Sequence, residues 1–241
     1  SSMLSFAGQK FALPVGSTRA TFQTHEEITI PCATPRKNFN VPLVKVSDLD
    51  EYCRKVFEYE YLNKVQSLVY PVAYNTNGNM LICAPTGAGK TDIALLTILN
   101  TIKQFSMINE EGGFDIQYDD FKIIYVAPLK ALAAEITDKF ARKLAVFDIK
   151  VRELTGDMQL SKKEILDTQV IVTTPEKWDV VTRKASGDND LTSKVKLLIL
   201  DEVHLLHEDR GSVIESLVAR TLRQVESSQT MIRILGISAT L

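Results

Sequence analysis

The sequence predicts an α/β fold in which helices cover both faces of a parallel β-sheet. Two observations indicate this class. Short apolar runs alternate along the chain with segments of helical periodicity, and the runs are apolar throughout rather than at every second residue. Strands buried on both faces have this composition, and parallel strands are joined by crossover helices. Of 241 residues, 45% are hydrophobic and 24% charged, which excludes collagen-like, coiled-coil and wholly disordered chains.

Residues 1–46 differ from the rest of the chain. Prolines recur in this stretch, no helical periodicity appears, and Ile28 alternates with Ile30 beside Thr29. Such a pattern is typical of an extended segment or a short edge strand. We predict an extended N-terminal arm that packs on the main body.

Residues 47–241 are expected to form one domain. Ser47 with Asp50 resembles a helix start, and apolar residues continue at helical spacing to Phe57. The expected strands are 80–83, 122–126, 170–173, 195–200 and 232–237, with a weaker one at 149–154. The expected helices are at about 90–105, 129–146, 176–184 and 212–226.

Residues 106–121 are predicted to be a flexible acidic insertion. The stretch contains two adjacent glycines and many acidic residues, and no lysine or arginine occurs between Gln104 and Phe121. The net charge of −2 argues against a dedicated nucleic-acid binder. That argument is weak here, because without this stretch the charge balance would be positive.

Cysteine usage and hydropathy exclude other classes. The three cysteines are far apart and form no Cys-x-x-Cys pair, so neither a disulfide framework nor a structural zinc site is expected. No apolar run reaches the ~18 residues that a membrane span requires. We expect a protein of the cytoplasm, with the nucleus as the alternative, and no membrane partner.

A glycine-rich loop, APTGAGKT at residues 84–91, separates an expected strand from an expected helix. Gly87 and Gly89 let backbone N–H groups turn toward a phosphate chain, and the helix N-terminus adds a positive dipole. Lys90 is expected to reach the β- and γ-phosphates, and the Thr91 hydroxyl is expected to coordinate Mg²⁺. One departure is the alanine that replaces the usual first glycine. The residues expected to bind the nucleotide are Ala84, Pro85, Thr86, Gly87, Ala88, Gly89, Lys90 and Thr91.

An acidic pair follows a second buried run. Asp201 and Glu202 open the string DEVH, directly after the run 195–200. Ligands of parallel sheets bind at the carboxyl ends of the strands. Asp201 suits the Mg²⁺ shell, and Glu202 suits the polarising of a water that attacks a phosphate. A solvated strand end with a helix-capping acid is the alternative for the pair alone, but the presence of Lys90 favours phosphate chemistry.

Together, APTGAGKT, DEVH and the string SAT resemble motifs I, II and III of superfamily 2 helicases, specifically the DExH group. The resemblance implies a RecA-like fold, ATP as the nucleotide, and a coupling role for Ser238, Ala239 and Thr240. It also implies that Gln66 reads the adenine edge, since an amide offers a donor and an acceptor together. His204 would link the acidic pair to motif III and to a second RecA-like domain.

Three more strings, APLKALAAE, LTGD and TTPEKWD, resemble loops that hold the sugar-phosphate backbone of a single strand in this superfamily. Backbone N–H groups and small hydroxyls would bind it without reading sequence. An ordinary helix start is the alternative for each, and Trp178 fits packing better than base stacking. The candidate nucleic-acid-binding residues are Pro128, Lys130, Ala131, Gly156, Asp157, Thr173, Thr174 and Pro175.

Longer strings, including LLILDEVHLLHEDRG and VTTPEKWDVVTRK, are similar to the superkiller-like branch with tandem helicase cassettes. Members couple ATP hydrolysis to 3′ to 5′ movement on RNA or DNA, in splicing, alkylation repair or the dismantling of stalled ribosomes. The string RTLRQVESSQTMIRILGISATL looks most like the ribosome quality control members. The resemblance implies single-stranded RNA as the partner, with DNA as the alternative, and a multi-subunit complex that acts on ribosomes.

The chain stops directly after motif III, so we expect a first RecA-like domain that lacks the second and hydrolyses ATP poorly alone. Two other function classes stay open. One is a different P-loop ATPase or a small-molecule kinase, and the other is a scaffold that holds ATP without turnover. A GTPase is disfavoured, because the only Asn-Lys pair, Asn63-Lys64, is not followed by the required aspartate.

Overall fold

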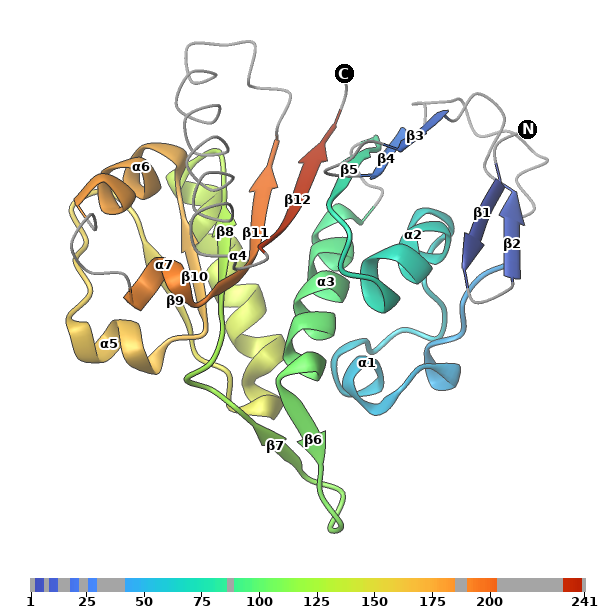
Figure 1. Cartoon of the computed structure of the whole chain (residues 1–241), viewed down its shortest axis with the longest axis horizontal. Helices are drawn as coiled ribbons and strands as arrows, with labels where there is room; N and C mark the ends of the chain where they lie inside the picture. Colours follow the sequence, from blue (N-terminus) through green and yellow to red (C-terminus); the bar gives the residue numbers. More distant parts are fainter. Residues whose placement is uncertain are drawn as a thin grey trace. The chain divides into compact units, whose positions relative to one another are not determined.

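The computed structural model describes residues 42–85, 89–184, 190–202 and 232–239, and the backbone of four short strands before them. The chain divides into two compact units, one of residues 1–100 with 235–241 and one of residues 101–234 (Figure 1). Both contain parallel strands joined through helices, which confirms the predicted α/β class.

The first unit contains a sheet of strand order β3-β4-β5-β12. β4 and β12 each run parallel to β5, and β3 and β4 are antiparallel, as are β1 and β2. β4 contains Ile28, in the stretch where the sequence indicates a short edge strand or an extended arm, and it lies between β3 and β5. The elements are β1 Met3–Phe6, β2 Gln9–Ala12, β3 Thr18–Thr21, β4 Glu26–Thr29, η1 Val46–Asp48, α1 Glu51–Val56, α2 Lys64–Asn75, β5 Met80–Cys83, α3 Lys90–Gln104 and β12 Arg233–Ser238.

The helix expected from Ser47 begins later than predicted. A 3-10 turn spans Val46–Asp48, and α1 starts at Glu51 with Asp50 as its N-cap, whose side chain accepts a hydrogen bond from the Cys53 backbone N–H. Asp50 rather than Ser47 caps the helix, because a carboxylate one residue before the first turn accepts a hydrogen bond from an N–H group that would otherwise lack a partner.

The second unit contains a sheet of order β11-β8-β10-β9, in which all the paired strands are parallel. β6 and β7 form a separate antiparallel hairpin. The elements are β6 Ser106–Ile108, β7 Phe114–Ile116, β8 Lys122–Val126, α4 Lys130–Leu144, η2 Ala145–Phe147, β9 Val151–Leu154, α5 Lys162–Asp167, β10 Val170–Thr173, α6 Pro175–Lys184, α7 Asp190–Ser193 and β11 Val195–Asp201.

Two successive residues of β8, whose side chains point to opposite faces, show that helices cover both faces of this sheet. Tyr125 packs edge-on against Phe140 of α4, with ring centroids 5.6 Å apart. Its neighbour Ile124, on the opposite face, belongs to a buried cluster with Trp178 of α6 and Leu191 of α7. Every residue of β8 is buried, and after Lys122 the strand is apolar because both of its faces are covered.

Several elements lie where the sequence predicts them and others do not. The predicted strands correspond to β5, β8, β9, β10, β11 and β12, and three of the predicted helices correspond to α3, α4 and α6. The helix expected at 212–226 lies outside the described residues. Residues 106–121 include the β6–β7 hairpin, and their flexibility stays a prediction. Among the residues that the structure describes, no helix is both long and apolar enough to cross a bilayer.

A buried lysine of β8 binds the C-terminal end of α5 in the second unit. Lys122 is only 3% exposed, and its Nζ donates hydrogen bonds to the carbonyls of Ile165 at 2.5 Å and Thr168 at 2.6 Å. These carbonyls lie at the C-terminal end of α5, where a positive charge is favourable. Burial, reinforced by Lys194, lowers the pKa of Lys122 from 10.5 to about 8.

We predict that Lys122→Met lowers the free energy of unfolding by about 1–3 kcal/mol, because it leaves carbonyls at the end of α5 without their donor. Urea titration measures the change, and Lys163→Met, at an exposed position of the same helix, is the matched control. A loss equal to that of the control would contradict the role of Lys122.

The same lysine predicts a pH dependence. Because its folded pKa of about 8 lies below the ordinary 10.5, the unfolded chain binds more protons between these two pH values. The contribution of Lys122 to the free energy of unfolding therefore rises from pH 8 to 10.5, and the difference between wild type and Lys122→Met grows over the same range. A constant difference in parallel urea titrations would show that the pKa is not lowered.

Candidate functional site

The described ends of the glycine-rich loop lie between β5 and α3 in the first unit. The Ala84 N–H donates to the carbonyl of Ser238 at 3.1 Å, and Ser238 pairs with Cys83 across β12 and β5. The first residue of motif III therefore adjoins the first residue of the loop, as neighbouring strands in register require. Thr86, Gly87, Ala88 and Thr240 lie outside the described residues, and Ala239 follows Ser238 at the strand end.

Lys90, the first residue of α3, reaches back across the loop. Its Nζ donates to the Ala84 carbonyl at 3.1 Å, so the ammonium group lies at the start of the loop that it closes. Thr91 follows in the first turn and is half-buried. The N-terminus of a 15-residue helix and a lysine ammonium both favour an anion here.

Gly89 adopts a left-handed conformation, with φ of +75°, and lies against amide side chains. A Cβ atom at this position would lie 2.3 Å from Gln66 Nε2 and 2.9 Å from Asn63 Nδ2. The left-handed backbone angle favours glycine at this position. Any larger residue would also have to displace the ends of the Gln66 and Asn63 side chains.

Gln66 connects α2 to the loop. Its Nε2 donates to the Gly89 carbonyl at 3.2 Å, and its Oε1 accepts from the Asn63 N–H in a capping box at the start of α2. The Gln66 side chain is buried rather than exposed to solvent on the helix surface. The expected adenine-reading residue therefore lies beside the phosphate loop.

Sequence reasoning missed a second support of α3. The Tyr59 hydroxyl donates to Asp92 Oδ2 at 2.9 Å, in the first turn of the helix. Burial and the adjacent Asp92 carboxylate raise the pKa of Tyr59, so it remains a donor near neutral pH. No motif marks this tyrosine, and only the contact between distant segments reveals it.

The acidic pair lies at the carboxyl end of β11 in the second unit. Asp201 Oδ2 accepts a hydrogen bond of 2.7 Å from the Tyr125 hydroxyl on the neighbouring strand β8. Tyr125 is 1% exposed, and burial, followed by Asp201, raises its pKa well above the ordinary value. The tyrosine is therefore a permanent donor that fixes one carboxylate oxygen. Tyr125 lies in an apolar run of the sequence that gives no sign of a partner, and only the pairing of β8 with β11 places it beside Asp201.

Glu202 leaves the strand with φ of +60°. A left-handed backbone at a residue with a side chain costs about 1–2 kcal/mol, and such strain concentrates at functional sites. The turn gives Glu202 a direction that continued extended backbone would not give. His204 lies outside the described residues.

The candidate nucleic-acid loops follow three adjacent strands. β8, β10 and β9 are neighbours in one parallel sheet, so the segments after Val126, Thr173 and Leu154 emerge at the same edge. Gly156 has φ of +57°, and a Cβ built there would lie 3.4 Å from Lys130 Nζ. This is the juxtaposition that the motif order predicts, and nucleic-acid contact itself stays a prediction.

Individual residues of this edge differ in exposure. Lys130, Ala131, Gly156 and Asp157 are exposed, whereas Pro128, Thr174 and Pro175 are buried. Thr173 is fully buried, and its Oγ1 donates to the Leu154 carbonyl at 2.6 Å. The Thr173 side chain therefore faces inward and joins β10 to β9, and a contact of this residue with nucleic acid stays a prediction. Trp178 is 3% exposed within the core cluster, so it packs, as the sequence favoured.

Comparison with protein families identifies the class. Residues 63–241 match the model of the DEAD/DEAH box helicase family. The match spans the loop, the acidic pair and motif III in their observed order. The chain belongs to the DEAD/DEAH box helicase family.

Particular relatives are similar over nearly the whole chain. The chain is 77% identical over 241 residues to RQC trigger complex helicase SLH1 of Saccharomyces cerevisiae, covering 99% of this chain and 12% of that protein. It is 60% identical over 237 residues to activating signal cointegrator 1 complex subunit 3 of Homo sapiens, covering 98% of this chain and 10% of that protein. The chain thus spans about a tenth of the length of these relatives.

Solved structures show the same fold. The chain resembles the DUF1998 helicase MrfA bound to DNA and AMPPNP, with a TM-score of 0.66, 19% sequence identity, and coverage of 83% of this chain and 28% of that one. At this identity the likeness concerns the fold, which is that of a helicase domain.

We predict that Tyr125→Phe lowers the free energy of unfolding by about 1.5–3 kcal/mol, because Asp201 loses its buried donor while ring packing on Phe140 remains. Guanidinium titration measures the loss. Tyr61→Phe, at a tyrosine that is 44% exposed, serves as the control and should change stability by less than about 0.5 kcal/mol. Equal effects would mean that the hydrogen bond to Asp201 contributes nothing.

Proposed function

We propose that this chain is the ATP-binding motor domain of an ATP-dependent helicase that moves 3′ to 5′ along single-stranded RNA, with DNA as the alternative strand. The observation that carries the proposal is the convergence of Lys90, Gln66 and Ser238 on one loop in a member of the helicase family. A relative with 54% identity in Arabidopsis thaliana is named DExH-box ATP-dependent RNA helicase DExH14.

The loop residues fit a nucleotide. Lys90 supplies a positive charge at the loop, and the N–H groups at the start of α3 are donors for phosphate oxygens. Gln66 donates one Nε2 hydrogen to the Gly89 carbonyl, and the second hydrogen of the same NH₂ group would donate to an adenine edge. Base recognition and loop conformation are thereby linked through one side chain. ATP supplies the phosphoryl group whose transfer to water releases free energy.

Thr91 and Asp201 would hold Mg²⁺, which neutralises phosphate charge. A hydroxyl and a carboxylate are hard oxygen ligands, and Mg²⁺ in such enzymes is bound by one or two carboxylates together with phosphates. Tyr125 orients Asp201 by occupying Oδ2. Glu202, directed by its left-handed turn, accepts the proton of the attacking water.

The edge after β8, β9 and β10 would hold the nucleic-acid strand. Exposed Lys130 offers a cation beside Gly156, whose lack of a side chain lets a phosphate approach the backbone. Thr173 shapes this edge from within through its hydrogen bond to Leu154. Ser238, Ala239 and Thr240, with His204, would couple nucleotide state to a second RecA-like domain. That domain would complete the ATPase site with an arginine.

The relatives support a proposal for the biological setting. The yeast and human proteins are named as a helicase of the RQC trigger complex and as a subunit of activating signal cointegrator complex 1. We assign the protein to ribosome-associated quality control in the cytoplasm, as a subunit of a complex that dismantles stalled ribosomes. Splicing and DNA alkylation repair are the alternative settings of the same motor.

We predict that Lys90→Ala weakens ATP binding at least 100-fold, since the loop loses its cation.

In the protein with both RecA-like domains, Glu202→Gln should retain ATP and RNA binding but lower RNA-stimulated turnover by about 10²–10⁴. A coupled ATPase assay and fluorescent-nucleotide titration measure these changes, and Glu60→Gln, at an exposed position, is the control. A normal rate of RNA-stimulated ATP hydrolysis in Glu202→Gln would contradict the role of Glu202 as the general base.

Crosslinking of the full-length protein to nucleic acid in cells tests the setting. Enrichment at ribosomal RNA near the mRNA path would support ribosome rescue. Enrichment at spliceosomal RNA or at damaged DNA would overturn that setting and leave the ATPase mechanism intact.

A further inference from the structure

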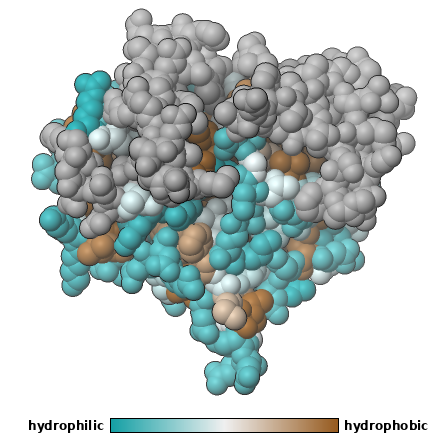
Figure 2. Space-filling view, viewed as in Figure 1, coloured by the Kyte–Doolittle hydropathy of each residue, from teal (hydrophilic) through white to brown (hydrophobic). Residues whose placement is uncertain are grey.

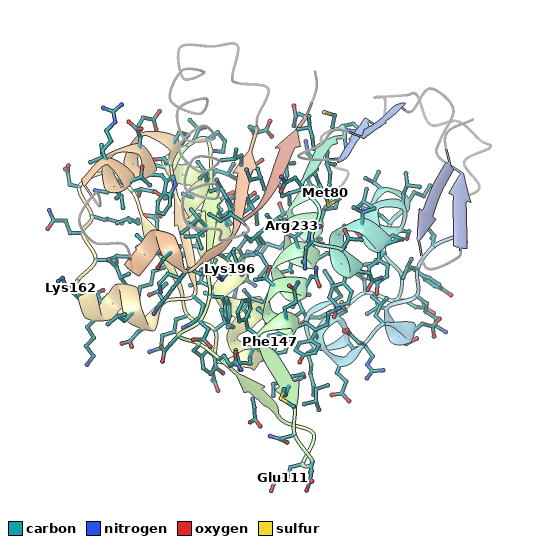
Figure 3. All side chains as sticks on the ribbon, in the orientation of Figure 1. Met80, Glu111, Phe147, Lys162, Lys196 and Arg233 are labelled. Carbon is teal, nitrogen blue, oxygen red and sulfur yellow. The ribbon has the colours of Figure 1, made fainter. Side chains whose placement is uncertain are left out.

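The β6–β7 hairpin of the second unit is well braced. The Asn109 side chain accepts hydrogen bonds from the N–H groups of Glu111 at 3.1 Å and Gly113 at 2.8 Å, which closes the turn. At the base, Phe114 packs edge-on against Phe147, with centroids 5.1 Å apart. Figure 3 labels Glu111 at the tip of the hairpin and Phe147 beside its base. These contacts close the turn and pack the base of the hairpin against the η2 turn.

This braced hairpin exposes large apolar side chains. Met107 is 71% exposed and Ile108 is 46% exposed. Successive residues of a strand point to opposite faces, so neither face of β6 is covered at these positions. Brown, hydrophobic atoms adjoin the hydrophilic tip in the space-filling view (Figure 2). Such exposure on a preformed strand is typical of a contact surface.

A hollow accompanies the exposed side chains, and the hairpin forms a two-stranded sheet of its own. The hollow has a volume of about 330 Å³ and is lined by Met107, Phe114, Asp115, Ile116, Gln117 and Tyr118. Among the described strands, β6 and β7 pair only with each other. A two-stranded sheet can accept a further strand along its edge, with side-chain pockets that select the added residues.

The charged residues of the stretch that contains the hairpin are all acidic. Glu110, Glu111, Asp115, Asp119 and Asp120 are all exposed, and no lysine or arginine lies between Gln104 and Phe121. Such a surface repels phosphate and attracts cationic side chains. It therefore favours a basic protein segment over a nucleic acid.

We propose that the β6–β7 hairpin docks an extended segment of a partner protein in which basic residues alternate with apolar ones. Apolar side chains of the segment contact Met107, Ile108 and the hollow, while its lysines or arginines face the acidic side chains. The hairpin precedes the first residue of β8, whereas the candidate nucleic-acid loop follows the last. The two surfaces thus lie at opposite ends of that strand, and a partner would bind without displacing RNA.

A fluorescein-labelled peptide of about eight residues, a usual strand length, with lysine alternating with isoleucine, tests the proposal by anisotropy on the full-length protein. We expect saturable binding that weakens as salt rises. Two control peptides, one with serine for isoleucine and one with glutamate for lysine, should bind at least about tenfold more weakly. If the serine peptide binds as tightly as the isoleucine peptide, charge attraction alone accounts for binding, and the proposal is overturned.

Variants of the protein locate the site. The double variants Met107→Ser/Ile108→Ser and Glu110→Lys/Glu111→Lys should each weaken binding at least about tenfold with an unchanged thermal unfolding midpoint. Leu166→Ser, at a leucine of α5 that is 48% exposed, and Glu60→Lys are the matched controls and should not. Control effects equal to those of the hairpin variants would exclude this docking site.

Two further measurements distinguish other occupants. Sedimentation equilibrium that shows self-association abolished by Met107→Ser/Ile108→Ser would assign the hairpin to a second copy of the chain and overturn the proposal. So would a loss of single-stranded RNA affinity on these substitutions. Unchanged RNA-stimulated ATPase activity in the hairpin variants is expected, because the docking surface does not depend on the motor function.

Discussion

The structure depends on the parallel register of its strands. Parallel pairing brings the carboxyl ends of neighbouring strands to one edge of each sheet, where backbone groups and side chains can meet a ligand. In the first unit this places Ser238 beside Ala84. In the second unit it places Asp201 beside Tyr125 and gathers the loops after β8, β9 and β10. Most of the residues with expected chemistry follow such a strand end.

Side-chain hydrogen bonds support the site, two of them from the buried residues Gln66 and Tyr125. Gln66 holds the Gly89 carbonyl, Tyr59 holds Asp92, and Tyr125 holds Asp201. Burial raises the pKa of both tyrosines, so they donate throughout the pH range in which an ATPase works. Groups placed in this way before ligands arrive cost less to order on binding. The family motifs define the reacting groups, and these neighbours hold them.

The hairpin shows a different use of the same fold. It joins α3 to β8 at the end of β8 remote from the nucleic-acid loop. An insertion at this end is free to carry acidic and apolar side chains without disturbing phosphate binding. A motor domain with a catalytic edge and a separate protein-binding edge would account for both the acidic insertion and the family motifs.

The sequence alone determined the fold class, the strands that carry the motifs, and the phosphate and acidic motifs, because apolar periodicity and glycine-rich loops are local signals. The sequence misplaced the start of α1, where Asp50 caps the helix. It did not assign α5 or the β6–β7 hairpin, because these segments are too short to show a periodic pattern of apolar residues. Only the tertiary structure decided that the Thr173 hydroxyl faces inward, that Tyr125 holds Asp201, and that Lys122 fastens α5. Each of these contacts joins residues far apart in the chain, and no local pattern specifies such a pairing.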